Sequence, residues 1–271
     1  MSALLRAPVW LWLACFVALP AAVLAVLSLA TPAQSVPPFT LGHDLATFTA
    51  ILDDSLYLDA ALASLRIAAS AALACLLIGY PMALAIARSA PARRPLLLLL
   101  VILPFWSGFL LRITAWVGIL RDEGWLNAVL GFLGIAPLQL LHTEAAMQIG
   151  LVYCYLPFMI LPLQARLAAA DPALEQAAAD LGASPSRAFW RVTFPLSLPG
   201  VWAGLALVFI PVAGEVVIPE LLGGPDALTF GRMVWDEFFG NHDWPRAAAL
   251  ALALLAVLLA PAFVLGARAR T

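Results

Sequence analysis

Residues 67–87 read IAASAALACLLIGYPMALAIA, and none of these side chains carries a charge. The hydrocarbon core of a bilayer is about 30 Å thick and a helix rises about 1.5 Å per residue, so about 20 apolar residues cross it. In lipid the backbone must satisfy its own hydrogen bonds, and a run that is apolar on every face does so as a helix. The stretch therefore predicts a membrane-spanning helix.

Six stretches meet the same test of length and apolar composition. They are residues 9–30, 67–87, 96–120, 145–163, 201–218 and 247–266. The first follows Arg6 as a signal peptide would, but its apolar run exceeds the roughly 7–15 residues of a signal core, so we expect a retained anchor. The chain is only 11% charged, against about 25% in soluble domains. We predict an all-α integral membrane protein with six transmembrane helices in one domain, residues 1–271.

The charges divide between the two sides of these spans. Nine arginines fall on one side and twelve acids fall on the other. Short loops rich in arginine stay in the cytoplasm, so both termini are expected there. The acidic outer face has two readings: acids cross the membrane without penalty, or an acidic vestibule concentrates a cationic solute. The nine arginines are Arg6, Arg88, Arg93, Arg94, Arg166, Arg187, Arg191, Arg268 and Arg270.

Several kinds of chemistry are excluded by missing residues. All 14 basic residues are arginine, so a P-loop lysine and a Schiff-base lysine are impossible. Cys15, Cys75 and Cys154 lie far apart in apolar runs, and the three histidines stand alone, so we expect no metal or redox site. A membrane-embedded enzyme lacks its usual motifs here, and a secondary carrier would show internal repeats. If the protein uses ATP, another polypeptide must bind it.

Residues 163–200 form a long connection that predicts structure of its own. They read LQARLAAADPALEQAAADLGASPSRAFWRVTFPLSLPG. Two helices are expected, each opened by a capping residue with proline at its first position, and the first closed by a left-handed glycine. We expect the second helix, SRAFWRV, to stop at a proline. These start and stop signals are Asp171 with Pro172, Gly182, Ser184 with Pro185, and Pro195.

The second of these helices presents aromatic and arginine side chains. Phe189, Trp190 and Phe194 lie beside Arg187 and Arg191, a combination typical of a protein–protein anchor. An interfacial amphipathic helix and a DNA-reading helix-turn-helix are the alternatives. Three arginines against three acids in this connection make phosphate binding weak, which disfavours DNA.

Residues 175–200, EQAAADLGASPSRAFWRVTFPLSLPG, resemble the EAA motif of permease subunits of bacterial ABC importers. The resemblance implies a type I ABC importer permease fold, in which residues 165–198 form a cytoplasmic loop, here called the EAA loop. Its coupling helix, residues 184–192, would dock on a separate ATP-binding subunit. Gln176 departs from the alanine that is usual in the family. The residues assigned to coupling in this way are Glu175, Ala178, Gly182, Ser184, Arg187, Phe189, Trp190 and Arg191.

Three further stretches, residues 104–127, 152–167 and 209–224, are similar to permeases of the spermidine/putrescine type. Permeases for opines, aminophosphonates, thiamine or iron share much of the pattern and remain alternatives. The resemblance implies a bacterial inner-membrane location, a second permease subunit, a periplasmic or lipid-anchored binding protein, and a dimer of ATP-binding subunits that holds ATP and Mg²⁺. This chain would hold no cofactor and bind no nucleic acid.

Inserting a charged residue inside a span costs about 2.5–3.5 kcal/mol, so such a residue is expected to have a partner, a water-filled cavity or a functional role. Arg112 and Glu215 should lie at similar depth, so we expect them to line the outer translocation path, where they could form an ion pair. Snorkelling to the interface is the alternative. Carboxylates and aromatic faces would suit a cation, although aromatic residues are also common at membrane interfaces. The expected path residues are Arg112, Glu215, Glu220, Trp106 and Tyr153.

Overall fold

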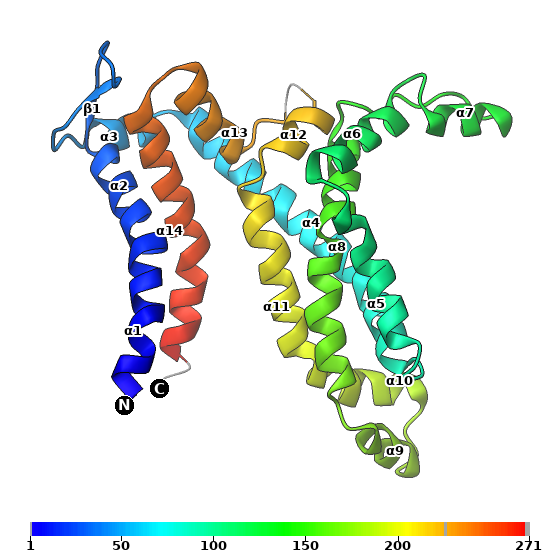
Figure 1. Ribbon diagram of the computed structural model, residues 1–271. Helices are drawn as coiled ribbons and strands as arrows, with labels where there is room; N and C mark the ends of the chain where they lie inside the picture. The colour runs from blue at the N-terminus through cyan, green and yellow to red at the C-terminus, as the bar shows by residue number, and fades with distance from the viewer. Residues whose placement is uncertain (1, 225–226, 269–271) are drawn as a thin grey trace. The chain divides into compact units, whose positions relative to one another are not determined.

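The computed structural model describes the backbone of residues 2–224 and 227–268, and side-chain surroundings for residues 8–224 and 227–258. Over these residues the chain is mostly helical (Figure 1). It divides into two compact units: one unites the residues up to Ser64 with those from Leu228, and the other comprises Leu65–Ala227. The single-domain expectation stays a prediction, and each unit is described by itself.

The first unit pairs an N-terminal with a C-terminal helical segment. The helix α2 packs against α14, and the two-residue strands β1 and β2 pair antiparallel with Thr31 opposite Thr40. Its core contains Tyr57, Phe230 and Leu250. Its elements are α1 (Ser2–Leu13), the π-helix η1 (Ala14–Ala18), α2 (Leu19–Ser28), β1 (Thr31–Pro32), β2 (Phe39–Thr40), α3 (Ala46–Asp53), α13 (Phe230–Trp235), the π-helix η4 (Asp236–Gly240) and α14 (Trp244–Arg268).

The second unit contains most of the candidate site. The helix α4 (Ser55–Arg88) begins in the first unit and ends in the second. The other elements of the second unit are α5 (Arg94–Ile102), the 3-10 helix η2 (Leu103–Trp106), α6 (Phe109–Leu120), α7 (Trp125–Phe132), α8 (Glu144–Ala168), α9 (Pro172–Asp180), α10 (Pro185–Ala188), the π-helix η3 (Phe189–Thr193), α11 (Phe194–Ala213) and α12 (Val217–Leu222).

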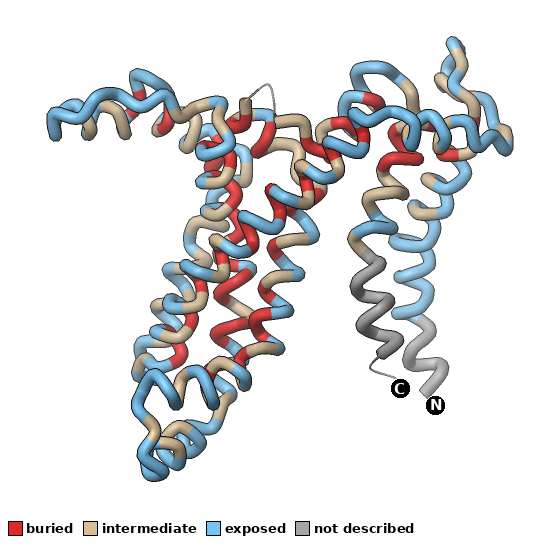
Figure 2. The backbone as a smooth tube through the Cα atoms, turned by 180° about the vertical axis from the view of Figure 1, so that it is seen from behind, coloured by how far each residue is buried: buried red, intermediate tan, exposed pale blue. Residues whose placement is uncertain are grey.

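The core of the second unit lies where α4, α8 and α11 meet, with α5 packed against it. Figure 2 shows the buried residues on the facing sides of these helices. Gly200 and Gly204, four residues apart on α11, lie against α8: a Cβ on Gly200 would meet Arg166 Cβ at 2.9 Å and Leu163 Cα at 3.1 Å. Small residues at this spacing let two membrane helices approach closely. The sequence contains this signal as GVWAG, which the apolar length of a span does not reveal.

The apolar helices agree with a multi-span protein. Four segments are long and apolar enough to cross a membrane, and a bent pair of helices makes a fifth. The sixth expected span, residues 247–266, falls in α14, whose described side chains end at residue 258. The four segments are Pro8–Ser28, Ser55–Arg88, Glu144–Ala168 and Pro185–Ala213, and the bent pair is Arg94–Trp106 with Phe109–Phe132.

Two of the expected spans are interrupted in the structure. Residues 96–120 are not one straight helix, because the chain bends by 86° after Trp106. Pro104 cannot donate a helical hydrogen bond, and Ser107 and Gly108 adopt extended ψ angles of 144° and 147°. Residues 201–218 are also interrupted, since α11 ends at Ala213 and α12 begins at Val217.

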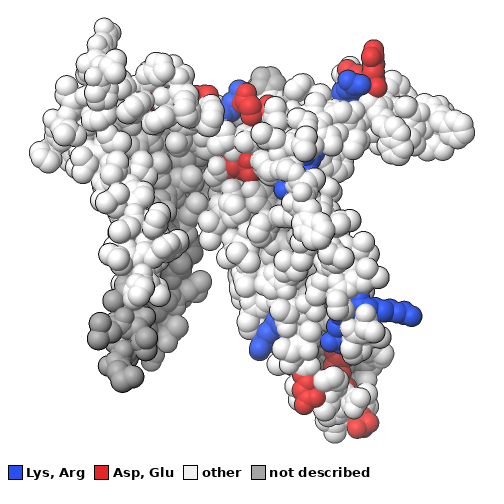
Figure 3. Space-filling view, in the orientation of Figure 1, with Lys and Arg blue, Asp and Glu red and all other residues white. Residues whose placement is uncertain are grey.

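On the face shown in Figure 3, the charged side chains of the second unit lie toward its two ends, and the surface between them is uncharged. This distribution agrees with apolar spans between polar ends. Asp226 and Arg270, which contribute to the expected charge asymmetry, lie outside the described residues, as do the side-chain surroundings of Arg6 and Arg268.

Candidate functional site

The caps expected in the EAA loop are present. The Asp171 carboxylate accepts the Ala173 N–H at 2.9 Å, and the Ser184 hydroxyl accepts the Arg187 N–H at 3.4 Å. Gly182 has a φ of +82°, in the left-handed region. The Ala183 N–H then donates to the Ala178 carbonyl at 3.0 Å, which closes the end of α9. Local sequence therefore fixes the loop's shape.

The expected stop at Pro195 is wrong. The helix that begins at Pro185 continues without a break to Ala213. The turn before Pro195 is π-helical, and the Phe194 N–H donates to the carbonyl of Phe189, five residues back. This wider turn accommodates a residue without an N–H at the start of α11. The coupling segment and the following span are therefore one continuous helix.

Glu175 contacts other parts of this chain. Its carboxylate accepts two hydrogen bonds of 3.0 Å from Arg88, at the end of α4, and one of 2.6 Å from the Thr193 hydroxyl in η3. The Thr193 hydrogen bond, followed by Arg88, holds the pKa of Glu175 below its usual range, although burial opposes this shift. Glu175 therefore connects α9 to α4 and to η3.

Two of the aromatic side chains expected on the surface face inward. Phe189 and Phe194 are half-buried, with ring centroids 5.7 and 5.9 Å from that of Tyr80 on α4. Tyr80 also shares a 2.9 Å hydrogen bond with Ser197. These contacts form because positions 189 and 194 lie on the side of the helix that packs on α4. They attach the coupling segment to the bundle.

The outward face of the EAA loop lacks two of the expected aromatic side chains and includes a residue that the prediction missed. Trp190 is 61% exposed, and Arg187 and Arg191 are exposed beside it. Leu181, just before Gly182, is 88% exposed. The sequence prediction did not assign Leu181 to the docking face, and its position next to the glycine cap was the available signal. The exposed face includes Leu181, Arg187, Trp190 and Arg191.

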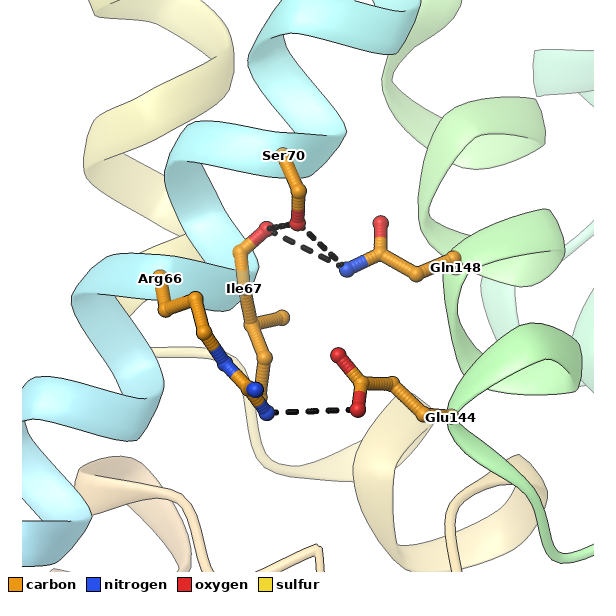
Figure 4. Close-up of polar contacts among 5 residues, drawn as sticks. All are labelled: Arg66, Ile67, Ser70, Glu144 and Gln148. Carbon is orange, nitrogen blue, oxygen red and sulfur yellow. Dashed lines mark hydrogen bonds and ion pairs between the residues drawn. The ribbon is translucent and has the colours of Figure 1, made fainter.

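Polar contacts also connect α4 to the start of α8 (Figure 4). Arg66 and Glu144 form an ion pair of 3.2 Å. One helical turn further along, the Gln148 amide donates to the Ser70 hydroxyl at 2.7 Å. Both contacts join residues about 80 positions apart, so the sequence did not reveal them.

The expected ion pair between Arg112 and Glu215 is absent from the described part of the chain. The Arg112 guanidinium lies 4.4 Å from the centroid of the Phe105 ring, and its Nε and Nη1 have no hydrogen-bond partner there. Glu215 lies between α11 and α12, where its carboxylate accepts the Tyr155 hydroxyl and, at 3.1 Å, the Val217 N–H. The helix break places Glu215 in the connection between α11 and α12.

The other expected path residues lie on separate elements. Trp106 is 75% exposed at the bend after η2, and Glu220 is exposed on α12. Tyr153 on α8 is partly exposed and packs edge-to-face on Trp116, with ring centroids 5.4 Å apart. Of the five expected residues, Arg112 alone is buried. The structure does not gather them into one cluster.

The described residues thus combine several apolar helices long enough to span a membrane with a capped helical loop between two of them. The profile of the family described as "binding-protein-dependent transport system inner membrane component" matches residues 9–269, which run through both compact units. The chain belongs to this family of ABC importer permeases.

Curated relatives match over most of their length. The chain is 40% identical over 256 residues to the spermidine/putrescine transport system permease protein PotB of Haemophilus influenzae, covering 93% of this chain and 88% of that protein. It is 41% identical over 216 residues to PotB of Escherichia coli, covering 79% and 78% respectively. A bacterial alginate ABC transporter, solved in complex with an alginate pentasaccharide-bound periplasmic protein, shares the fold with a TM-score of 0.70 and 20% identity, over 96% of this chain and 90% of that one.

Proposed function

We propose that this permease subunit takes up polyamines of the putrescine and spermidine type. The observation that supports this most strongly is the 40% identity to a spermidine/putrescine permease over 93% of the chain. The excess of acidic residues in the loops assigned to the outer side is consistent with a cationic solute. Opines, aminophosphonates and other small solutes are the alternatives for the same kind of importer.

The proposed transporter needs three kinds of partner. A dimer of ATP-binding subunits would hold ATP and Mg²⁺, since this chain has no lysine for a P-loop. A second permease, a different chain, would complete the path. A periplasmic or lipid-anchored binding protein would deliver the solute, and the alginate transporter, a protein of the same fold, was solved with such a protein. Both termini would lie in the cytoplasm of a bacterial cell.

The EAA loop would transmit the motion of the ATP-binding subunits. Leu181, Arg187, Trp190 and Arg191 form its exposed face, on which the subunit would dock. Because the helix is continuous from Pro185 to Ala213, displacement of the docked end moves α11 directly. The contacts of Glu175 and Tyr80 carry the same displacement to α4. Glu175 and Phe189 act here as positioning residues within the permease.

The translocation path would use the carboxylates at and beyond the end of α11. Glu215 and Glu220 lie on either side of the start of α12, and Tyr153 and Trp106 offer aromatic faces. Such groups attract ammonium ions. Arg112, a cation itself, would repel them.

Uptake by cells tests the proposed solute. A bacterial strain without polyamine uptake would receive this chain together with the subunits encoded beside it, and accumulation of labelled spermidine would be measured. We expect uptake that unlabelled putrescine or spermidine reduces and that opines or aminophosphonates do not. Uptake that only an opine or an aminophosphonate reduces would show that the importer has another solute.

A further inference from the structure

A buried cation lines a cavity of about 510 Å³ in the second unit. This cavity, here called the Arg112 pocket, lies between η2, α6, α8 and α11. Arg112 is 9% exposed, and it is the one charged residue among those that line the pocket. The walls are otherwise aromatic or apolar apart from Cys154 and Tyr155, and include Phe105, Phe158, Ala206 and Ile210.

The guanidinium of Arg112 lacks the hydrogen bonds that its burial demands. Its Nε and Nη1 are buried and have no partner within the described residues. The rings of Phe105 and Phe109, with centroids 4.4 and 5.8 Å away, contact its face and accept no conventional hydrogen bond. Leaving a charged donor buried and unpaired is unfavourable. The described residues therefore supply no acceptor for these two donors.

A second observation also favours an anion. The helix α6 begins at Phe109, a pocket residue, and its N-cap Gly108 provides no side-chain cap. The first N–H groups of α6 and their partial positive charge therefore lie beside the Arg112 pocket. A polyamine would be repelled by both features, so the pocket is not a solute site for the proposed function.

The size and lining of the pocket indicate which anion fits. A cavity of this volume is in the range of ligand-binding sites and exceeds what one carboxylate group fills. Arginine is well suited to the oxygens of a phosphate, and the aromatic walls require an apolar body beside it. We propose that the Arg112 pocket binds a phosphate group carried on an apolar body, either the phosphate end of a membrane phospholipid or a small soluble organophosphate.

Binding measurements on the full-length chain, purified in neutral detergent with its co-purifying subunits, test this. The lipid probe is phosphatidylglycerol, counted as retained molecules by native mass spectrometry. The soluble probe is phenyl phosphate, with inorganic phosphate as the probe that lacks an apolar body. We expect at least one of phosphatidylglycerol and phenyl phosphate to bind, and Arg112→Gln to weaken that binding by about tenfold or more. Arg121→Gln, at the exposed end of α6, is the matched control and should bind as the wild type does.

A second variant separates loss of the site from loss of the fold. Ala206 lines the pocket from α11 and is exposed there, so Ala206→Trp should fill the cavity and prevent binding while Arg112 stays in place. Binding of phosphatidylglycerol alone would identify a lipid site, and binding of phenyl phosphate alone would identify a soluble ligand. Both results support the proposal.

Four results would overturn the proposal. The first is that neither probe binds, and the second is that Arg112→Gln and Ala206→Trp bind the probe as tightly as the wild type does. The third is that inorganic phosphate binds as well as phenyl phosphate. The fourth is that the isolated chain binds a probe that the assembled transporter does not bind. The last result would mean that an acidic side chain of the second permease fills the pocket. Polyamine uptake can succeed or fail independently of each of these results.

Discussion

The carboxylate of Glu175 contacts two elements besides its own helix. Arg88 comes 87 residues earlier and Thr193 comes 18 residues later, and both donate to the same Oε1 atom. Thr193 is buried, whereas the Glu175 side chain is 41% exposed. The buried hydroxyl fixes the position of the carboxylate, and the exposed arginine adds an ion pair that water screens.

Removal of the Thr193 hydroxyl should loosen α9. Thr193→Val keeps the shape of the side chain but removes its hydrogen bond to Glu175, so we expect the local stability of α9 to fall by about 1 kcal/mol. Hydrogen exchange of the α9 amides measures this. Thr114→Val is the control, because the Thr114 hydroxyl bonds only to carbonyls of its own helix. Unchanged exchange in Thr193→Val would show that the contact does not hold the loop.

The contribution of Glu175 should depend on pH. Its pKa is lowered in the folded protein, so its stabilising effect is complete above the unfolded-state pKa of about 4.3 and is lost as the pH falls through the lower folded value. Exposure limits the effect to less than about 1 kcal/mol. We expect α9 to be better protected from hydrogen exchange in the wild type than in Glu175→Gln at pH 7, and the two proteins to converge only as the pH falls below the folded-state pKa of Glu175. A difference that stays constant with pH would contradict the ionic contact.

Gly182 should tolerate asparagine better than valine. Its φ of +82° costs a β-branched residue about 1–2 kcal/mol, although a Cβ there would meet no described atom within 4 Å. Limited proteolysis of the EAA loop should therefore be faster in Gly182→Val, with Gly182→Asn close to the wild type. Equal cleavage of all three proteins would show that backbone conformation at this position is unimportant.

Among the elements, α8 and α11 depend on close approach. Gly200→Ala would place a Cβ against backbone atoms of α8, including the Pro162 carbonyl at 3.1 Å. We expect a loss of about 1–3 kcal/mol in stability, measured as thermal unfolding in detergent. Gly118→Ala in α6 is the control, since no described atom lies within 4 Å of its Cβ, and it should be neutral or slightly stabilising. If the two variants unfold alike, the glycine contact is not what holds these helices together.

The sequence predicted those features that depend on neighbouring residues, namely apolar helices and helix ends. Apolar length located the spans, and Asp171, Gly182 and Ser184 marked the limits of the loop helices because caps act within a few residues. Hydropathy could not detect the bend at Ser107 or the end of α11 at Ala213, since apolar residues continue through both. It also could not pair Glu175 with Arg88 or place Arg112 over Phe105, because tertiary packing decides these contacts.

The whole molecule is proposed to convert ATP hydrolysis elsewhere into motion of its spans. The exposed end of the 185–213 helix carries Trp190 and Arg191, and its other end approaches Glu215. One continuous helical segment therefore connects the docking face to the proposed path. Function on this account requires the exposed Trp190 and tolerates the loss of Trp125, an exposed tryptophan outside both the docking face and the proposed path.

ATP-driven accumulation of labelled spermidine in proteoliposomes, with the complete set of subunits, tests the central claim most directly. We predict that spermidine accumulates only when ATP is present at the face where the ATP-binding subunits lie. Accumulation should fall by about tenfold or more in Trp190→Ala, as expected of an anchoring aromatic residue. It should be normal in Trp125→Ala, which removes an exposed tryptophan from α7. Accumulation without ATP, or at the wild-type rate in Trp190→Ala, would contradict the account.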